Sequence, residues 1–319
     1  MKIINQNLRT INLLEFVPDA ITTRSGNKAK YKLIRKKDNF EISKPYNRKK
    51  SYLPNFIVME PEDFIGIGMY FAEGDKHLNS PGPTSNTGCI GIVNSDAMAV
   101  KTFCSLLNKL NIPSEEFSFK IGLNINFKIK VDKINLLNYW TKKLNLNPNK
   151  KRPKWIYYTG KIGNYRNIGT SEKGHILLLY NSTILRSFFL NFITEIFDIC
   201  IKNKYKEELS LILKGFFAGD GSVSYNEKPR RKQVDFLNKN QVLLNKIRES
   251  LKILGLKSIK ETWPKKTRVN SKALRIYNYH DFKILQDYEI LELIGYKKKT
   301  FEKLMKSYEN TPKTFFKIK

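Results

Sequence analysis

Two acidic residues are the clearest candidates for chemistry in this chain. Glu73 ends the apolar run FIGIGMYFAE, Asp220 ends the run LKGFFAGD, and a glycine follows each acid. Carboxylates provide the oxygen ligands that Mg²⁺ prefers, and a Mg²⁺ ion held by one or two of them keeps several water molecules. The pair predicts a divalent-metal site if the fold brings the two acids together.

Helices are the elements that would have to position these acids. Pro61, followed by two acidic residues, is typical of a helix start. Gly74 and Gly221 are typical of the residue just past a helix end. We therefore expect one helix from about residue 61 to 73 and a second one that ends at residue 220.

Small residues form a stripe along each predicted helix. Gly68 and Ala72 are four positions apart in the first run, and Gly215 and Gly219 have the same spacing in the second. Residues four apart share a helix face, and two smooth faces let two backbones approach closely. Both acids would then meet at the negative end of two helix dipoles, where a cation must compensate them. The alternative is that the acids are solvated and the small residues only ease packing.

The two runs resemble the motifs of the LAGLIDADG homing endonuclease family, in its single-chain form with two motifs. The resemblance implies an α+β fold of two pseudo-symmetric α-β-β-α-β-β-α units, whose antiparallel sheets form a saddle over duplex DNA. It also implies a monomer that hydrolyses phosphodiester bonds at a long specific target with Mg²⁺, for which Mn²⁺ can substitute. Glu73 and Asp220 would bind the metal, with Ala72 and Gly219 beside them. Glu73 departs from the aspartate that is usual in the family.

An internal repeat supports the duplication. The offset of 147 residues that separates the two acids also lays residues 272–278 on 125–131, and the basic cluster 297–299 on the cluster 150–152. Residues 125–131 alternate between apolar and polar side chains, as a half-buried strand does. We expect both segments to be matching strands, with Leu274 and Ile276 facing inward.

The basic clusters supply further candidates for catalysis. Lys151 and Lys298 each lie 78 residues after an acid and resemble the active-site lysines of the family. Their role would be to polarise water or to stabilise developing negative charge. The register within each cluster stays open, so Lys150 and Lys297 are alternatives, and all four could instead contact phosphates.

Asn94 and Asn238 occupy another matched pair of positions, each shortly before a predicted helix. The resemblance places a polar side chain here, near the nucleophilic water. The alternative role is ordinary N-cap chemistry.

Outward-facing strand residues are candidates for contacts with DNA bases. Arginine and lysine pair with guanine, and asparagine and glutamine pair with adenine, whereas many polar side chains contact only phosphates. The candidates are Lys76, His77, Asn126, Lys128, Lys130, Arg230, Arg231, Lys232, Gln233, Arg275 and Tyr277.

The chain divides into four expected parts. Residues 1–60 are a basic DNA-contacting arm or small subdomain, and residues 61–152 are the first LAGLIDADG unit. Residues 153–205 are an extra ββα segment that braces the first unit and connects it to the second. Residues 206–319 are the second unit, which ends in a helix at 301–308 and a basic tail.

Composition favours a nucleic-acid partner. The chain of 319 residues has 58 lysines and arginines against 29 acids, a net charge of +29, which indicates a polyanionic partner. Compositional bias toward lysine explains part of this excess. No long apolar span or signal peptide is evident, so we expect no membrane association. Three scattered cysteines predict a reducing, intracellular location and argue against a zinc module.

Two functional classes stay open. The first is a homing-type DNA endonuclease, expected to be a free-standing product encoded within an intron. The second is an RNA maturase that binds intron RNA, or a catalytically inactive nucleic-acid-binding protein on the same fold.

Overall fold

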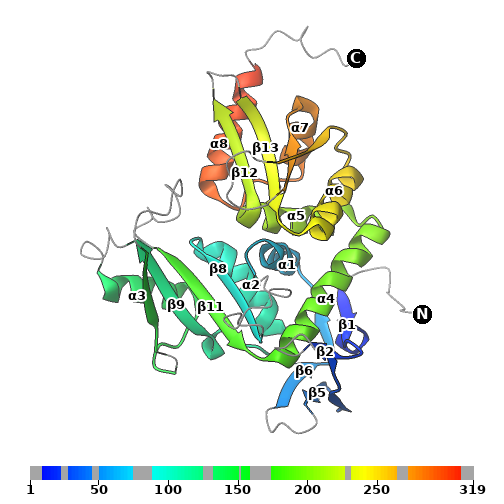
Figure 1. Cartoon of the computed structure of the whole chain (residues 1–319), viewed down its shortest axis with the longest axis vertical. Coiled ribbons are helices and arrows are strands. Elements are labelled where there is room, and N and C mark those ends of the chain that lie inside the picture. Colours follow the sequence, from blue (N-terminus) through cyan, green and yellow to red (C-terminus); the bar gives the residue numbers. More distant parts are fainter. Residues whose placement is uncertain are drawn as a thin grey trace.

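Helices α1 (Pro61–Glu73) and α5 (Lys206–Asp220) lie together between two lobes (Figure 1). The computed structural model describes residues 9–22, 28–44, 50–74, 88–124, 132–150, 152–158, 174–226, 231–263 and 272–309. Both predicted helix ends are confirmed, because the backbone N–H of Gly74 donates to the Tyr70 carbonyl and that of Gly221 to Phe217. A Cβ on Gly74 would lie 2.4 Å from the Tyr70 oxygen, so space rather than backbone conformation requires glycine here.

The second lobe has the expected order of elements, including the helix at its end, which begins six residues earlier than predicted. After α5 the chain forms β12 (Gly221–Asn226), β13 (Arg231–Asn238), α6 (Gln241–Leu254), β14 (Ile259–Thr262), β15 (Lys272–Ile276), α7 (Tyr279–Asp287) and α8 (Gly295–Glu309). The four strands form an antiparallel sheet in the order β12-β13-β15-β14. Phe236 and Leu274 are buried on the face toward α5, where the Phe236 ring contacts Phe217. Arg275 lies on the opposite face, which we call the outer face.

The first lobe also contains a four-stranded sheet. Its elements are β8 (Cys89–Asn94), α2 (Ala97–Lys109), η2 (Ser114–Glu116), β9 (Ser118–Asn124), α3 (Lys133–Leu144), β10 (Lys154–Tyr158) and β11 (His175–Asn181). The strand order is β10-β9-β11-β8, and β10 pairs with β9 in parallel while the other pairs are antiparallel. The whole is an α+β fold with mainly antiparallel sheets.

The strand that corresponds to β15 is not the predicted one. In the first sheet Leu178 of β11 pairs with Ile92, as Leu274 of β15 pairs with Phe236 in the second. Strand β11 therefore takes the position that the 147-residue offset assigned to residues 125–131, which lie outside the described residues. The segment 153–205 contains the two predicted strands, β10 and β11, but both are integral to the first sheet, so they are not extra to the first unit.

The N-terminal part forms a small β-rich module that packs on helix α4 (Thr183–Lys202). The Phe16 ring lies 5.3 Å from the Phe192 ring, and the Phe40 ring 6.2 Å from the Phe188 ring, measured between centroids. We call the described residues from 9 to 59 the N-terminal module. Its elements are β1 (Thr10–Asn12), η1 (Leu13–Phe16), β2 (Ile21–Thr22), β3 (Lys28–Ala29), β4 (Lys32–Arg35), β5 (Asn39–Ser43), β6 (Lys50–Pro54) and β7 (Phe56–Val58).

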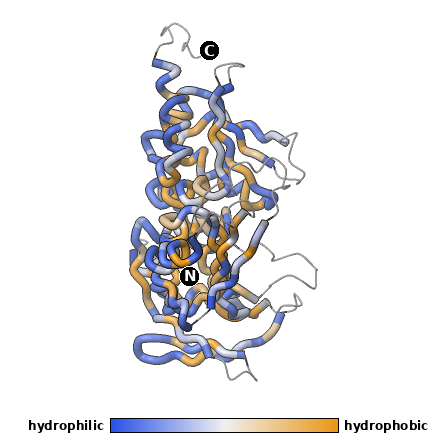
Figure 2. Tube along the Cα trace, turned by 90° about the vertical axis from the view of Figure 1, so that its left-hand side faces the viewer, coloured by the Kyte–Doolittle hydropathy of each residue, from blue (hydrophilic) through white to orange (hydrophobic). Residues whose placement is uncertain are grey.

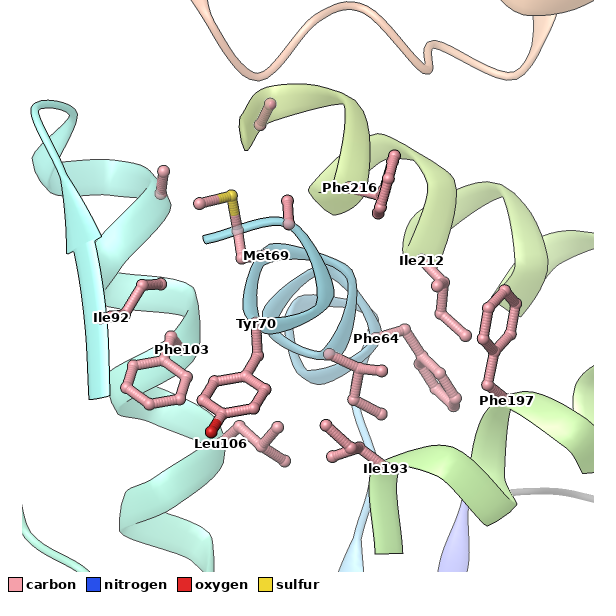
Figure 3. Packing of buried hydrophobic residues seen from close by; sticks show 14 of the residues in the cluster. Phe64, Met69, Tyr70, Ile92, Phe103, Leu106, Ile193, Phe197, Ile212 and Phe216 are labelled. Atoms are coloured by element: carbon pink, nitrogen blue, oxygen red, sulfur yellow. The ribbon is translucent and has the colours of Figure 1, made fainter. Parts of the chain in front are cut away.

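The hydrophobic core surrounds α1. Figure 3 looks along this helix and shows Phe103 and Leu106 of α2 on one side, Ile193 of α4 below, and Phe197 of α4 with Ile212 of α5 on the other side. Hydrophobic residues gather inside the lobes, while hydrophilic ones follow the outside of the trace (Figure 2). None of the helices in the described parts of the chain is long and apolar enough to cross a lipid bilayer.

Candidate active site at the paired helix ends

The small residues of α1 and α5 are the points of closest contact between the two helices. A Cβ on Gly68 would lie 1.9 Å from the Ile212 carbonyl oxygen, and one on Gly215 would lie 2.0 Å from the Ile65 carbonyl oxygen. Neither position can hold a side chain unless a backbone moves. The prediction that the two stripes face each other is confirmed.

Glu73 and the residue before Asp220 are in contact across this helix pair. A Cβ on Gly219 would lie 2.5 Å from the Ala72 Cβ and 3.3 Å from Oε1 of Glu73. The Glu73 carboxylate therefore lies against the end of α5, beside the residue that precedes Asp220. Both acids are partly buried, and they lie at the ends of two helices that are in contact where Ala72 meets Gly219.

Lys297 adds a cation to the same place. Its Nζ donates to the carbonyl oxygens of Phe217 at 2.9 Å, Ala218 at 2.7 Å and Gly219 at 3.3 Å. The residue is only 4% exposed, and burial lowers the pKa of its ammonium from 10.5 to about 8, although attraction from Glu73 and Asp220 works in the opposite direction. This ammonium compensates the negative end of α5.

The structure favours Lys297 over Lys298 as the lysine of the second cluster. Nζ of Lys298 lies 3.3 Å from Oε1 of Glu292, in a half-exposed ion pair. In the first cluster, Lys150 is exposed and forms an ion pair with Glu116. Lys151 lies outside the described residues, so its predicted role is untested.

Asn94 and Asn238 have equivalent local geometry. Oδ1 of Asn94 accepts a hydrogen bond from the Asp96 backbone N–H at 2.8 Å, and Oδ1 of Asn238 accepts one from Asn240 at 2.9 Å. The N-caps themselves are Asp96 and Asn240. Nδ2 of Asn238 donates to Oδ2 of Asp220 at 2.7 Å, so this asparagine holds one of the two acids.

The DNA-contact candidates of the second sheet divide between its two faces. Arg231, Gln233 and Arg275 lie on the outer face, while Lys232 points to the opposite side, where its Nζ is 3.7 Å from the centre of the Tyr308 ring. The prediction that Lys232 faces outward with its neighbours is therefore wrong, because adjacent strand residues face opposite ways. Tyr277, just after β15, is 51% exposed. The remaining candidates lie outside the described residues: Lys76, His77, Asn126, Lys128, Lys130 and Arg230.

The groups at the helix ends fit a hard divalent cation. Glu73 and Asp220 supply carboxylates, and the Ala72 carbonyl belongs to the same helix ends, whereas the Gly219 carbonyl accepts a hydrogen bond from Nζ of Lys297. Within the described residues, no group of three or more acidic, histidine or cysteine side chains forms a metal-binding cluster. Two carboxylates with backbone oxygens suit Mg²⁺, which retains several water ligands.

Comparison with known proteins gives similarity of limited extent. No curated protein matches the chain. Among solved structures, the N-terminal LAGLIDADG domain of DUF199/WhiA is 15% identical, with 75% of this chain and 87% of that chain covered and a TM-score of 0.38. I-DmoI in complex with DNA and Mn is 14% identical, with 71% and 94% covered and a TM-score of 0.38. The meganuclease I-SmaMI bound to uncleavable DNA is 13% identical, with 78% and 88% covered and a TM-score of 0.34.

A family match lies in the second lobe. Residues 207–288 match the family described as a LAGLIDADG-like domain. This segment runs from the first turn of α5 to the residue after α7, and it includes Asp220 and Asn238. Lys297 and the whole first lobe lie outside it.

Proposed function

We propose that the protein is a site-specific endonuclease that hydrolyses double-stranded DNA with a divalent metal ion. The observation that carries the proposal is the convergence of Glu73, Asp220 and Lys297 at the ends of two helices that touch through glycines. The net charge of +29 supports a DNA substrate. On this proposal the protein acts as a monomer at a long target and promotes the homing of an intron.

Each residue of the site has a role that follows from its contacts. Glu73 and Asp220 would hold the ion, which when bound would supply an acidified water and neutralise charge at phosphorus. Asn238 keeps Asp220 in place through its hydrogen bond. Lys297, with a pKa of about 8, is mostly protonated at neutral pH, and its charge would help to stabilise the negative charge that develops at phosphorus. Mg²⁺ is the expected ion, with Mn²⁺ as a substitute.

Amide substitutions of the acids test this proposal. Wild-type protein is first used to enrich binding sequences from a library of random duplexes, and the enriched duplex is then incubated with MgCl₂. We expect Glu73→Gln and Asp220→Asn each to slow cleavage by about a thousandfold or more, because each removes a metal-binding charge. Their affinity for the duplex in EDTA should stay within about threefold of wild type, since a single partly buried carboxylate contributes little to the interface.

Lys298→Gln is the control, since Lys298 lies next to Lys297 on α8 but its Nζ pairs with Glu292. It should cut at nearly the wild-type rate. Rapid cleavage by either acid variant would refute the assignment of the active site.

A catalytically inactive nucleic-acid-binding protein is the second candidate, and one observation favours it. The Lys297 ammonium already compensates the α5 carbonyl end and lies close enough to both acids to feel their charge. In that case wild-type protein would enrich a DNA or intron-RNA sequence but leave the DNA uncut. A titration with Mn²⁺, followed by electron paramagnetic resonance, would then show the same number of bound ions for wild type and for Asp220→Asn.

A further inference from the structure

Four side chains on the outer face of the second sheet form a continuous hydrogen-bonded row. Nε of Arg231 donates to Oε1 of Gln233 at 3.0 Å, and Nε2 of Gln233 donates to Oδ2 of Asp235 at 2.6 Å. Arg275, on the neighbouring strand, donates from Nε to Oδ1 of Asp235 at 2.9 Å and from Nη2 to Oδ2 at 3.2 Å. We call these four residues the polar row.

Strand pairing explains how the polar row forms. Asp235 of β13 lies between Ser222 of β12 and Arg275 of β15 in the sheet register. Its neighbour Phe236 points the other way, into the core against α5. The polar row therefore belongs to the face that the proposed function turns toward DNA.

Burial separates the row into a centre and two ends. Gln233 and Asp235 are 7% and 5% exposed, so they are buried within the face. Arg231 is exposed, and the Arg275 side chain is 26% exposed. The two arginines are thus available to a ligand, while the residues that hold them are not.

An acid at this position does not help general attraction to DNA. A carboxylate on a DNA-facing surface repels phosphates, and burying it costs free energy that its ion pair must offset. What Asp235 does provide is a fixed orientation of Arg275. Because Nε and one N–H of Nη2 are engaged, the donors left on Arg275 are the second N–H of Nη2 and those of Nη1, at the tip of the guanidinium. Two parallel donors at such a tip match N7 and O6 of guanine.

We propose that Asp235 is a specificity-determining positioning residue, which orients Arg275 toward a guanine and, through Gln233, orients Arg231 toward a second base. The inference rests on the proposed function in that it requires duplex DNA on the outer face, but it requires no cleavage. Gln233 is then a link in the polar row rather than the adenine-contacting residue that its type predicted, because its amide oxygen and nitrogen both serve the row.

Selection from a random duplex library tests the inference. Wild type, Asp235→Asn and Arg275→Lys are each used to enrich 24-base-pair duplexes, without added metal, and base preferences are read by sequencing. We expect wild type to show a guanine position whose preference falls by roughly tenfold in both variants. Affinity of Asp235→Asn for a random duplex should stay equal or rise, since a negative charge is lost. A purely structural role would instead weaken binding to all sequences together.

Glu261→Gln provides a control with the same change of charge in the same sheet. Glu261 forms ion pairs with Arg248 and Lys272 on the helix side of β14, so its variant should keep every base preference. Arg275→Lys keeps the positive charge and loses only the two parallel N–H donors of the guanidinium. It therefore tests the inference even if Asp235→Asn does not fold.

Three results would bear on the proposals differently. An unchanged guanine preference in Asp235→Asn overturns the inference, and so does a wild-type protein that enriches no sequence, which also overturns DNA recognition in the proposed function. Enrichment without cleavage would refute only the nuclease, and the role of Asp235 would stand.

Discussion

Lys297 places a positive charge in an almost fully buried position beside two carboxylates. Its three hydrogen bonds go to successive carbonyls at the end of α5, so the helix dipole and the acids together make the ammonium tolerable there. Burial still outweighs these attractions, because the pKa falls to about 8. The residue is therefore a source of pH dependence in this part of the chain.

Stability should rise with pH because of this lysine. Between about pH 8 and the unfolded value near 10.5, the folded protein binds fewer protons at Lys297 than the unfolded chain does, so its contribution to the free energy of unfolding increases with pH. We expect Lys297→Met to lose this increment, by up to about 1 kcal/mol per pH unit. Urea unfolding in EDTA at about pH 7.5, 8.5 and 9.5 measures it.

The comparison with Lys298→Met isolates the effect, since Lys298 is half exposed in its ion pair with Glu292. That variant should keep the wild-type dependence on pH. Parallel curves for wild type and Lys297→Met would show that the Lys297 ammonium has an ordinary pKa.

At the residue scale, the sequence identified the type of group better than its position. A run of three lysines at 297–299 carries the same charge at each place, so the cluster alone does not distinguish Lys297 from Lys298. The helical period would have distinguished them, because Lys297, Phe301 and Leu304 share the buried face of α8. That helix was predicted from residue 301 and begins at Gly295, so the informative turn was missed.

At the scale of elements, the sequence predicted correctly where helices α1 and α5 touch. Glycines four residues apart are sufficient to predict which faces meet, because only a residue without a side chain permits contact between backbones. Strand matching was less reliable. Residues 125–131 alternate as regularly as β15 does, yet β11 pairs with β8 in the equivalent register. Alternation identifies a half-buried strand, but hydrogen-bond partners far along the chain decide its neighbours.

Alanine at the helix contact should be strongly destabilising. A Cβ on Gly215 would lie 2.0 Å from the Ile65 carbonyl oxygen, and only movement of a helix can relieve that overlap. We expect Gly215→Ala to reduce the free energy of unfolding by about 3 kcal/mol or more and, on the proposed function, to abolish cleavage by separating the two acids. Chemical denaturation measures the first effect.

Gly295→Ala is the matched control at the other extreme, since nothing lies within 4 Å of a Cβ at this position in the first turn of α8. Helix propensity predicts a neutral or slightly stabilising change, of at most about 1 kcal/mol. Equal effects at the two glycines would mean that α1 and α5 are not in backbone contact.

At the scale of the whole molecule, the two lobes are related but unequal. In each lobe the glycine after the central helix forms an antiparallel pair with a strand residue, Gly74 with Ile92 and Gly221 with Phe236. Both lobes also have an asparagine before a capped helix. Helix α3 and strand β10 are inserted between β9 and β11 in the first lobe. A single offset between the acids did not reveal this insertion, because the matched basic cluster at 150–152 lies within it, between α3 and β10.

Part of the positive charge of the molecule lies in the N-terminal module, outside the two repeated lobes. The N-terminal module carries Lys30, Lys32 and Lys37 as exposed residues, and its docking on α4 through Phe16 and Phe192 fixes it to the first lobe. On the proposed function, a basic surface docked on the first lobe would add phosphate contacts, each of which releases counterions. The module would then extend the protein's contact with duplex DNA.

Salt dependence of DNA binding tests this extension. For a random duplex, log K should fall linearly with log salt, by about 0.9 per phosphate contact. If the module contacts DNA, changing Lys30, Lys32 and Lys37 together to glutamine should make the slope shallower by up to about 2.7, measured by fluorescence anisotropy between about 50 and 200 mM KCl. The control changes three exposed lysines around α6 and α7, Lys252, Lys257 and Lys283, which belong to the helix side of the second sheet and should leave the slope nearly unchanged. Equal slopes for wild type and the module variant would confine the contact surface to the two lobes, and the module would then serve to support α4.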